Sequence, residues 1–557
     1  MATAQKTVTR GWLRRTPSLE RFISDHAQPL QELQRPVVLI AGYRTRETLA
    51  SWRTAFQFRL HVITPHDVVP VIDGIASFAA TSTEAIERYI ASIGPVAAVI
   101  DEESEDLPAR LERFQHFFWH VAAGGYYIAP VTTISSAWEA GLQALKTRKI
   151  SDKEIAELDA SSGLTLDDNG YTITVKTRTH LAKVKDEDAM TVLPGRLGAN
   201  NVRLMGSRSA GTGPKTLRFE NHGARRRMRM PASPMKYPEL TLKDFHGPTQ
   251  LRDSMLAVHG STVLPSSFKH PWRAWNDNLL NFNDGVASLA VDDTRTDYLP
   301  GEYYDLTCAV PGHFGHVMTE SLAKLWGWQD AKRQVPGLKA FYRMPSADHE
   351  PTFEKALFTA AGIDERDIHW EHRDVTVDRF VSPSQAWQNG GWHFVHPVIL
   401  DTWKRLREEL VQKDVASAER IFVSRQRGAE NRAVRNLLEV ERYFADRGFE
   451  VVYPEELSTK GQATVFGNAK VIAGLAGSGM FNMLFADRLE KVILLSQDSY
   501  SARNEHIYAS LLADEFHYFW SPADQEQVHG KFSLEAFHSS WEFDFETNRR
   551  ALDHVTA

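Results

Sequence analysis

The chain has 557 residues, too many for one hydrophobic core, and domains of roughly 100–200 residues lead us to expect two to four of them. Its 42% hydrophobic and 24% charged residues are typical of a soluble globular protein, and a formal net charge of -7 argues against a general nucleic-acid binder. The single cysteine, Cys308, excludes a disulfide framework within the chain and fits a reducing cytoplasm or a cysteine-poor proteome, so we expect a cytoplasmic location.

The sequence predicts neither a secretory signal nor a membrane span. The N-terminal residues carry positive charge, but no apolar run follows them. No stretch reaches the roughly 18 uninterrupted apolar residues of a spanning helix. Any contact with a membrane would therefore be peripheral.

Buried strands alternate with helices in the first part of the chain. Residues 1–34 are polar and predict a lead-in with a short helix. Continuous apolar runs predict strands at 36–42, 61–64, 96–101 and 124–129, and helical spacing predicts helices at 83–93 and 111–121. This alternation favours parallel β–α–β units, so residues 35–160 are expected to form a Rossmann-like domain.

The next segment, 161–250, reads as a small β element and a linker. Residues 171–177 alternate with period two, as a half-exposed strand does. The basic cluster 225–229 follows, and then a proline-bearing stretch. The cluster could contact a phosphate, but a solvated turn beside a domain boundary is the preferred interpretation.

A second α/β pattern fills the C-terminal half. We divide it into a region at 251–415, a Rossmann-like region at 416–520 and a tail at 521–557. Gly448 is placed to end a helix predicted over 432–446, and Thr459 with Gln462 fits a capping box. Strands are predicted at 420–424, 449–453, 470–473 and 491–496, with a short helix from Met480.

A glycine-rich loop follows one of these strands. It contains Gly474, Gly477, Ser478 and Gly479 and precedes the helix at Met480. Backbone amides and a helix N-terminus in such a place can hold a diphosphate at the carboxyl ends of parallel strands. The spacing matches neither G-x-G-x-x-G nor the P-loop, so a turn that binds nothing is the alternative.

Arginines flank the preceding strand and helix. Ser424, Arg425 and Arg427 follow a strand end, and Arg432 and Arg435 begin the next helix. Strand ends on one sheet face a common crevice, so Arg425 is expected beside the glycine loop, where its planar donor fork suits phosphate. Surface charge at a helix start is the alternative, although a cation is unfavourable at that end of the helix dipole.

A third group of polar residues contains His313, His316 and Glu320. His316 and Glu320 are four residues apart and would share one helical face. Such a pair could act as a general base. It could also bind a metal, but no third zinc ligand is evident from the spacing, and a plain surface pair remains the alternative.

These motifs together resemble glycosyltransferase family 61. Residues 312–326, with H-x-x-x-E followed by Ser321-Leu322-Ala323-Lys324-Leu325-Trp326, look like the N-lobe motif of that family. Residues 421–485 look like its C-lobe, in order and spacing, at Val423-Ser424-Arg425, Arg432, Val434, Asn436, Glu439, Gly448-Phe449, Gln462, Phe466, Ala469, Gly474, Gly477, Gly479, Asn482 and Phe485.

The resemblance implies a fold, a reaction and a set of site residues. It implies two Rossmann-like lobes of the B type, a nucleotide-sugar donor, inversion at the anomeric carbon and no need for a metal or another cofactor. We expect a UDP-linked donor, a glycan or other hydroxyl acceptor, and a role in surface or capsular polysaccharide synthesis. Glu320 or His316 would take the acceptor proton; the donor residues would be Ser424, Arg425, Arg432, Asn436, Gly474, Gly477, Ser478, Gly479 and Asn482.

Two departures from the family pattern keep a different function open. Ala476 stands where the family loop commonly has histidine, and Leu437 follows Asn436 where glutamate is frequent. A non-catalytic member that binds a nucleotide sugar or a glycan is therefore a rival interpretation.

The N-terminal domain suggests two more interpretations. Residues 97–101 and 117–128 resemble the later strands of a class I methyltransferase, but Gly42-Tyr43-Arg44-Thr45 lacks the glycine-rich cofactor turn, so we predict a degenerate scaffold. A working methyltransferase domain remains a rival interpretation. Asp101-Glu102-Glu103 at a strand end could also imitate the metal-binding D-x-D of the other glycosyltransferase class.

Overall fold

The chain folds as two units whose sequences interleave. In this computed structural model, unit 1 holds residues 1–203, 246–251 and 256–296, and unit 2 holds residues 204–245, 252–255 and 297–557. The residues that the structure describes are 19–40, 60–64, 75–80, 82–102, 107–130, 162–166, 171–213, 216–223, 230–290, 295–426, 431–528 and 532–557. The chain therefore passes between the units more than once.

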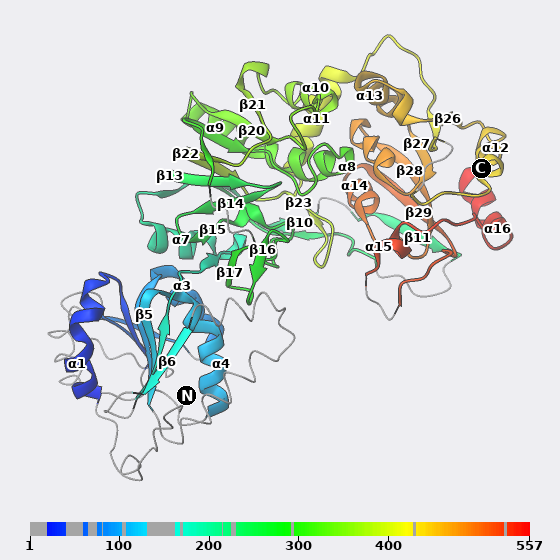
Figure 1. The fold of residues 1–557 in the computed structure, drawn as a ribbon. Helices are drawn as coiled ribbons and strands as arrows, with labels where there is room; N and C mark the ends of the chain where they lie inside the picture. The colour runs from blue at the N-terminus through cyan, green and yellow to red at the C-terminus, as the bar shows by residue number, and fades with distance from the viewer. Residues whose placement is uncertain are drawn as a thin grey trace. The chain divides into compact units, whose positions relative to one another are not determined.

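Unit 1 is built on one sheet with the order β3-β2-β1-β4-β5-β7-β6. Strands β1 to β5 pair in parallel, and β7 and β6 continue the sheet antiparallel. Helix α1 packs on one face through Leu30, and α3 and α4 cover the other through Ile90 and Phe117 (Figure 1). The bounds are α1 Leu19–Glu32, β1 Val37–Ile40, β2 Leu60–Thr64, β3 Ala76–Ala79, α3 Thr83–Ile93, β4 Val96–Asp101, α4 Leu107–Phe117, β5 Val121–Pro130, β6 Ser162–Leu166 and β7 Tyr171–Lys176.

The strands predicted at 61–64 and 96–101 and the helix predicted at 83–93 are confirmed here. The helix predicted over 111–121 ends early, because Phe118–His120 form a buried 3-10 turn and β5 starts at Val121. Residues 42–45, 225–229 and Glu103 lie outside the described residues.

A smaller, largely antiparallel group completes unit 1. Its strands follow the order β16-β17-β8-β15-β14 and pack around Leu256, Val263 and Leu279. The bounds are β8 Leu181–Lys183, α7 Ala189–Leu197, β14 Leu256–His259, β15 Thr262–Val263, β16 Leu279–Asn281 and β17 Val286–Leu289.

Unit 2 begins its N-lobe, which we define as residues 297–410, with a parallel sheet. Its strands follow the order β22-β19-β20-β21, and β18 pairs with β22. The bounds are β18 Asp297–Tyr298, β19 Glu302–Asp305, α8 Phe314–His316, α9 Trp328–Gln334, β20 Lys339–Arg343, α10 Thr352–Ala360, β21 Ile368–Glu371, β22 Val375–Pro383, β23 Trp387–Gln388, β24 Phe394–Val395 and α11 Ile399–Leu410.

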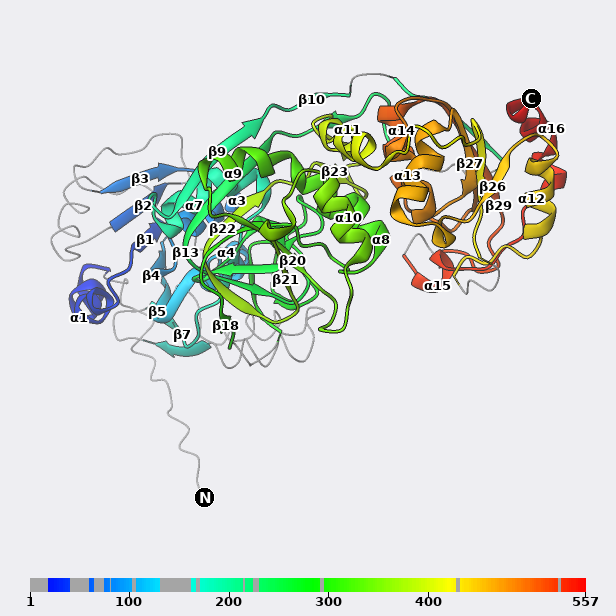
Figure 2. The same cartoon turned by 90° about the horizontal axis from the view of Figure 1, so that it is seen from above.

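The C-lobe, which we define as residues 420–557 with strand β11, holds a second parallel sheet. Its order is β11-β29-β28-β27-β25-β26. Helices α12 and α16 cover one face, and α13 and α14 pack against the other (Figure 2). The bounds are β11 Arg218–His222, β25 Arg420–Val423, α12 Leu437–Ala445, β26 Glu450–Val452, α13 Thr459–Asn468, β27 Val471–Leu475, β28 Leu489–Gln497, α14 Asn504–Leu512, β29 Ala513–Ser521, α15 Leu534–Phe537 and α16 Phe545–Thr556.

The strand order of the C-lobe fixes where a ligand would bind. From β25 the chain continues to β26, which pairs with one edge of β25, and then to β27, which pairs with the opposite edge of β25. This reversal creates a switch point, and ligands of open α/β sheets bind beyond the carboxyl ends of the strands at such a point. The Rossmann-like α/β fold predicted from the sequence is confirmed, and the loops after β25 and β27 meet at the switch point.

Three local predictions in the C-lobe need correction. Helix α12 begins after Asn436 rather than at 432, because Arg432 has a left-handed backbone with φ of 57°. The helix at 459 is capped by Ser458, whose hydroxyl accepts from the amide of Gly461, so the predicted capping box is displaced by one residue. The segment predicted as a helix from Met480 is a 3-10 helix over Ser478–Phe485.

The C-lobe also draws strands and helices from segments predicted to lie outside it. Strand β11 comes from the predicted linker, and α15 and α16 come from the predicted tail. Among the described helices, none combines the length and hydropathy that a membrane crossing needs.

Candidate functional site

The glycine loop lies at the carboxyl end of β27. Gly477 has φ of 148°, a conformation that L side chains rarely adopt, and a Cβ there would collide with Arg425 Nη2. The backbone thus approaches an arginine side chain as closely as only glycine allows. Ser478 then opens the 3-10 helix.

Two backbone amides of the glycine loop already donate hydrogen bonds within the protein. The amide of Ala476 donates to the carbonyl of Leu495 at 3.0 Å, and the amide of Gly477 donates to Glu505 Oε1 at 2.7 Å. The first bond of the 3-10 helix runs from Met480 to Gly477 at 3.0 Å. The first amides of a helix have no partner within the helix, so the amides of Ser478 and Gly479 are the ones that could donate to a ligand. Of the predicted loop, these two amides are the candidates for binding an anion.

Glu505 supports the loop from α14. Its side chain is fully buried, and its Oε1 also accepts from the Tyr500 hydroxyl at 3.1 Å. Burial raises the pKa of Glu505, and its Oε2 is buried without a hydrogen-bond partner. Sequence reasoning missed Glu505, because no motif marks a residue some 28 positions beyond the loop it holds.

Two guanidinium groups meet at the loop. Arg425 donates one hydrogen bond to the carbonyl of Ala476 and another to the carbonyl of Asn431 at 3.1 Å. Arg432 lies over the rings of Tyr500 and Phe537, with its Cζ at 5.1 and 5.4 Å from the ring centroids. A Cβ on Gly477 would lie 3.3 Å from Arg432 Nη2, so both groups reach one glycine.

The electrostatics of this pair favour an anion. Burial and the neighbouring charge of Arg432 together lower the pKa of Arg425 to about 10. Among the described residues, the hydrogen bonds of Arg425 go to backbone carbonyls and not to a carboxylate. Arg432 Nε is buried without a hydrogen-bond partner. Glu505 is a nearby acidic group, and it bonds to the amide of Gly477 rather than to either arginine. Two adjacent guanidinium groups without a carboxylate in direct contact form a site that suits a phosphate or diphosphate.

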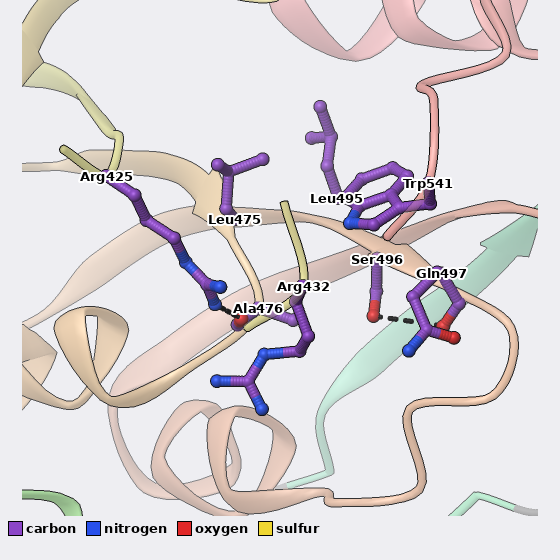
Figure 3. Close-up of a pocket in the computed structure, with 8 residues that line it drawn as sticks. All are labelled: Arg425, Arg432, Leu475, Ala476, Leu495, Ser496, Gln497 and Trp541. Atoms are coloured by element: carbon purple, nitrogen blue, oxygen red, sulfur yellow. Dashed lines mark hydrogen bonds between the residues drawn. The ribbon is translucent and has the colours of Figure 1, made fainter. Parts of the chain in front are cut away.

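A small hollow, with no room for a water molecule, lies beside these arginines (Figure 3). Trp541, from the predicted tail, reaches it because its backbone bonds to Ala433 and Arg435 at 3.0 Å each. The pocket is lined by Arg425, Arg432, Leu475, Ala476, Leu495, Ser496, Gln497 and Trp541. Neither Trp541 nor Gln497 carries a sequence signal for this position.

The H-x-x-x-E segment forms the other side of the site. His316 Nδ1 lies 2.7 Å from Glu320 Oε1, across α8 and the π-helical turn Val317–Ser321. Glu320 is buried, and its Oε2 accepts from the amide of Ala309 at 2.7 Å. The predicted pairing of His316 with Glu320 is therefore present, and the carboxylate is held at both oxygens.

This segment faces the glycine loop. A Cβ on Gly315 would lie 3.1 Å from Ser478 Cβ. The rings of His313 and His316 meet edge to face, with centroids 5.1 Å apart. Burial lowers the pKa of His313, and the charges of His316 and Arg432 add to this effect. The structure thus brings the predicted proton-transfer pair and the predicted donor loop into one site.

Other residues predicted to bind the sugar donor form hydrogen bonds within the fold instead. The Ser424 hydroxyl donates to Glu441 Oε1 at 2.6 Å. Asn436 bonds to both backbone groups of Phe543, at 3.0 and 2.9 Å. Asn482 donates to the carbonyl of Gly479 at 3.1 Å, while its Oδ1 is buried without a partner. Asn482 therefore positions the loop.

Gly474 also packs rather than binds. It lies inside β27, and a Cβ there would lie 2.6 Å from the sulfur of Met480 and 2.8 Å from Val423. Only glycine lets β25 and β27 lie this close at the switch point. This residue shapes the base of the site.

In unit 1, the Asp101 carboxylate is buried in the fold. It accepts from Arg113 Nε and the Tyr127 hydroxyl at 2.8 Å each. These bonds favour a structural role over the D-x-D interpretation. A separate cavity of about 480 Å³ lies in the same unit, with Glu87, His116, His120 and Lys183 among its lining residues.

Comparison with known proteins matches this site to one family. The family described as Glycosyltransferase 61 matches residues 314–493, a span that holds His316, Glu320, Arg425 and the glycine loop. No curated protein matches the chain.

Solved structures give only a weak likeness. Two of them are of MycE methyltransferase from the mycinamycin biosynthetic pathway, one in complex with Mg, SAH and mycinamycin VI and one with Mg and SAH. Each is 17% identical, with a TM-score of 0.24 over 29% of this chain, and the match spans about half of the solved chain, 50% and 51%. Such a score carries no argument about function. The family resemblance read from the motifs is confirmed over residues 314–493, the span that matches the Glycosyltransferase 61 family.

Proposed function

We propose that unit 2 is an inverting glycosyltransferase of the hexosyl or pentosyl class. It would move a sugar from a nucleotide-sugar donor, UDP-linked, to a hydroxyl of a glycan or similar acceptor, in surface polysaccharide synthesis in the cytoplasm. The observation that carries the proposal is the meeting of Arg425 and Arg432 at Gly477, at a topological switch point.

The donor diphosphate would bind at this meeting point. Arg425 and Arg432 would contact phosphate oxygens, and the amides of Ser478 and Gly479 would add donors at the start of the 3-10 helix. To reach the phosphate, Arg425 would exchange its bond to the carbonyl of Ala476 for a bond to the ligand. The cations favour the transition state most, because negative charge grows on the leaving diphosphate.

The acceptor would be activated at the opposite side of the site. Both oxygens of Glu320 already accept a hydrogen bond, one of them from His316 Nδ1. The geometry therefore supports His316 Nε2 as the atom that takes the proton, with Glu320 fixing the tautomer and stabilising the imidazolium. In the alternative mechanism, which the sequence also suggested, Glu320 takes the acceptor proton directly.

The reaction balances without a further reactant. The acceptor oxygen forms a bond to the anomeric carbon while the bond from that carbon to the diphosphate oxygen breaks, and the configuration inverts. The acceptor proton passes to His316, and the electron pair leaves with the nucleoside diphosphate. As the resemblance implies, the proposed reaction uses no metal or other cofactor.

A binding experiment tests the proposal before any acceptor is known. UDP should raise the melting temperature of the full-length chain, and at one hundred times its dissociation constant it should add about 2.7 kcal/mol of stability. Other nucleoside diphosphates and inorganic phosphate serve as comparisons. Absence of binding by every nucleoside diphosphate would contradict the proposal.

Ala476 favours a second candidate, a non-catalytic member that binds a nucleotide sugar. The family commonly has histidine at this position. Here the side chain is a small buried methyl group, and the backbone carbonyl of Ala476 accepts a hydrogen bond from Arg425. The two functions differ in turnover: a catalyst releases sugar from its donor, slowly to water and faster to an acceptor. Donor binding without any release would favour the second candidate.

A further inference from the structure

Two histidines and a glutamate converge at the edge of the C-lobe sheet. Glu220 and His222 lie two residues apart on β11, the outermost strand, and so face the same side of the sheet. His517 lies on the parallel neighbour β29, in register with Glu220. Strand geometry alone thus places the three side chains together.

The distances between their ligand atoms suit one metal ion. His222 Nε2 lies 3.3 Å from His517 Nδ1 and 3.7 Å from Glu220 Oε2, and all three atoms lie within 4.8 Å of one another. Zinc bonds to histidine nitrogen at about 2.0–2.1 Å, so two ligands of a tetrahedral site are separated by about 3.3–3.4 Å. The histidine pair already has this spacing.

The surroundings resemble the support that a metal ligand receives. The other ring nitrogen of His517, Nε2, is buried without a hydrogen-bond partner and lies 3.6 Å from Glu515 Oε2. Glu515 is itself held by Arg218 at 2.8 Å. A carboxylate behind a ligating histidine is the usual device that fixes the ring and its tautomer.

The ring packing and the access from solvent also fit. His222 stacks on Phe519 with ring centroids 4.5 Å apart, which holds its plane. Glu220 is exposed, so an ion can enter from solvent and a water can complete the coordination.

A bond between the two histidines is the competing explanation. It accounts for the 3.3 Å between their nitrogens. The register of β11 and β29 accounts for the placement of Glu220 and Glu515 beside these histidines. A bound ion adds a reason for ligand atoms of Glu220, His222 and His517 to meet at one point.

We propose that Glu220, His222 and His517 bind one zinc ion, which fastens β11 to β29. The two strands belong to segments almost 300 residues apart, so the ion would act as a clasp between the polypeptide before the N-lobe and the last strand of the C-lobe sheet. Strands β28 and β27 separate β29 from β25, so the clasp lies away from the donor loop.

The test is a zinc titration of the full-length chain after treatment with a chelator and dialysis. We expect one Zn²⁺ per chain by calorimetry, and a higher melting temperature with Zn²⁺ than without it. His222→Ala and Glu220→Gln should each weaken zinc binding by tenfold or more, with an unchanged circular dichroism spectrum. These two residues are preferred to buried His517, whose replacement could disturb the strand.

The matched control is His372→Ala. His369 and His372 flank Glu371 at 3.6 and 3.7 Å, but this set does not converge on one point, so the variant should bind zinc like the parent. Loss of saturable zinc binding in His222→Ala alone supports the site. Equal affinity in the parent and His222→Ala, or no saturable binding by the parent, overturns it. UDP binding should be the same in all variants.

Discussion

The guanidinium of Arg425 donates a hydrogen bond to the carbonyl of Ala476, the residue that precedes Gly477 in the glycine loop. This bond joins the end of β25 to the end of β27. It also holds the Arg425 guanidinium where Arg432 brings a second one. The site therefore presents two guanidinium groups before any ligand arrives.

The first prediction concerns Arg425. Arg425→Ala should weaken UDP binding by tenfold or more, because a charged hydrogen bond to phosphate is worth about 1.5–3 kcal/mol. Isothermal titration calorimetry measures the change. Arg435→Ala is the matched control, since Arg435 is exposed and already paired with Asp524 and Glu542. Equal dissociation constants for the parent and Arg425→Ala would remove Arg425 from the site.

The second prediction concerns the His316–Glu320 pair. Glu320→Gln and His316→Ala should each slow glycosyl transfer by about 10²–10⁴-fold and leave the dissociation constant of UDP nearly unchanged, because proton transfer matters only in the transition state. His349→Ala is the control, since His349 forms a similar pair with Glu354, also at 2.7 Å, and is not assigned a role in proton transfer.

Two results would revise this assignment. Transfer within threefold of the parent in a well-folded Glu320→Gln protein would limit Glu320 to a structural role. Loss of UDP binding together with activity would move the pair into the donor pocket.

The third prediction separates backbone strain from ligand binding. Gly477→Ala and Gly448→Ala both place a side chain at positive φ, 148° and 77°, and each should cost about 1 kcal/mol or more of folding stability. A Cβ on Gly477 would displace Arg425, whereas one on Gly448 would meet nothing within 4 Å. Only Gly477→Ala should therefore weaken UDP binding, and equal binding by the two variants would contradict this account of the loop.

The fourth prediction is a pH dependence from Glu505. Burial raises the folded pKa of this carboxyl above its ordinary value of 4.5, so its contribution to stability is fully present below pH 4.5 and is lost as pH rises through the folded pKa. Glu505→Gln keeps an acceptor for Gly477 and has no such titration. The melting temperature of the parent should therefore fall relative to that of Glu505→Gln as pH rises from 4 to about 8. A constant difference would contradict the prediction.

The sequence predicted the elements around the site better than the contacts within it. Apolar runs and Gly448 located β25, β26, β27 and β28, because buried parallel strands are continuous and apolar. Helical spacing gave the His316–Glu320 pair directly. No local sequence pattern predicts a contact between residues about 160 positions apart. The expectation that this pair lies near Ser478 therefore came from the family resemblance.

Other features depend on tertiary contacts that no spacing encodes. Arg432 was expected at a helix start, but its amide donates to the carbonyl of His538 at 2.9 Å, and the backbone there turns left-handed. Ser424 fitted the family motif, yet its hydroxyl is bound to Glu441. The pocket residue Trp541 arrives from a segment that appeared in the sequence only as a tail.

Because the two units interleave in sequence, the chain is constrained in how it folds during synthesis and in where it can be cleaved. The strands of unit 1 are not all synthesised until residue 289, whereas β11 of unit 2 has by then already emerged and must wait for β29 at 513–521. During synthesis on the ribosome, β11 therefore has an unpaired edge while nearly 300 further residues are added. A single break near residue 240 would leave β11 on one fragment and β29, the strand with which it pairs, on the other.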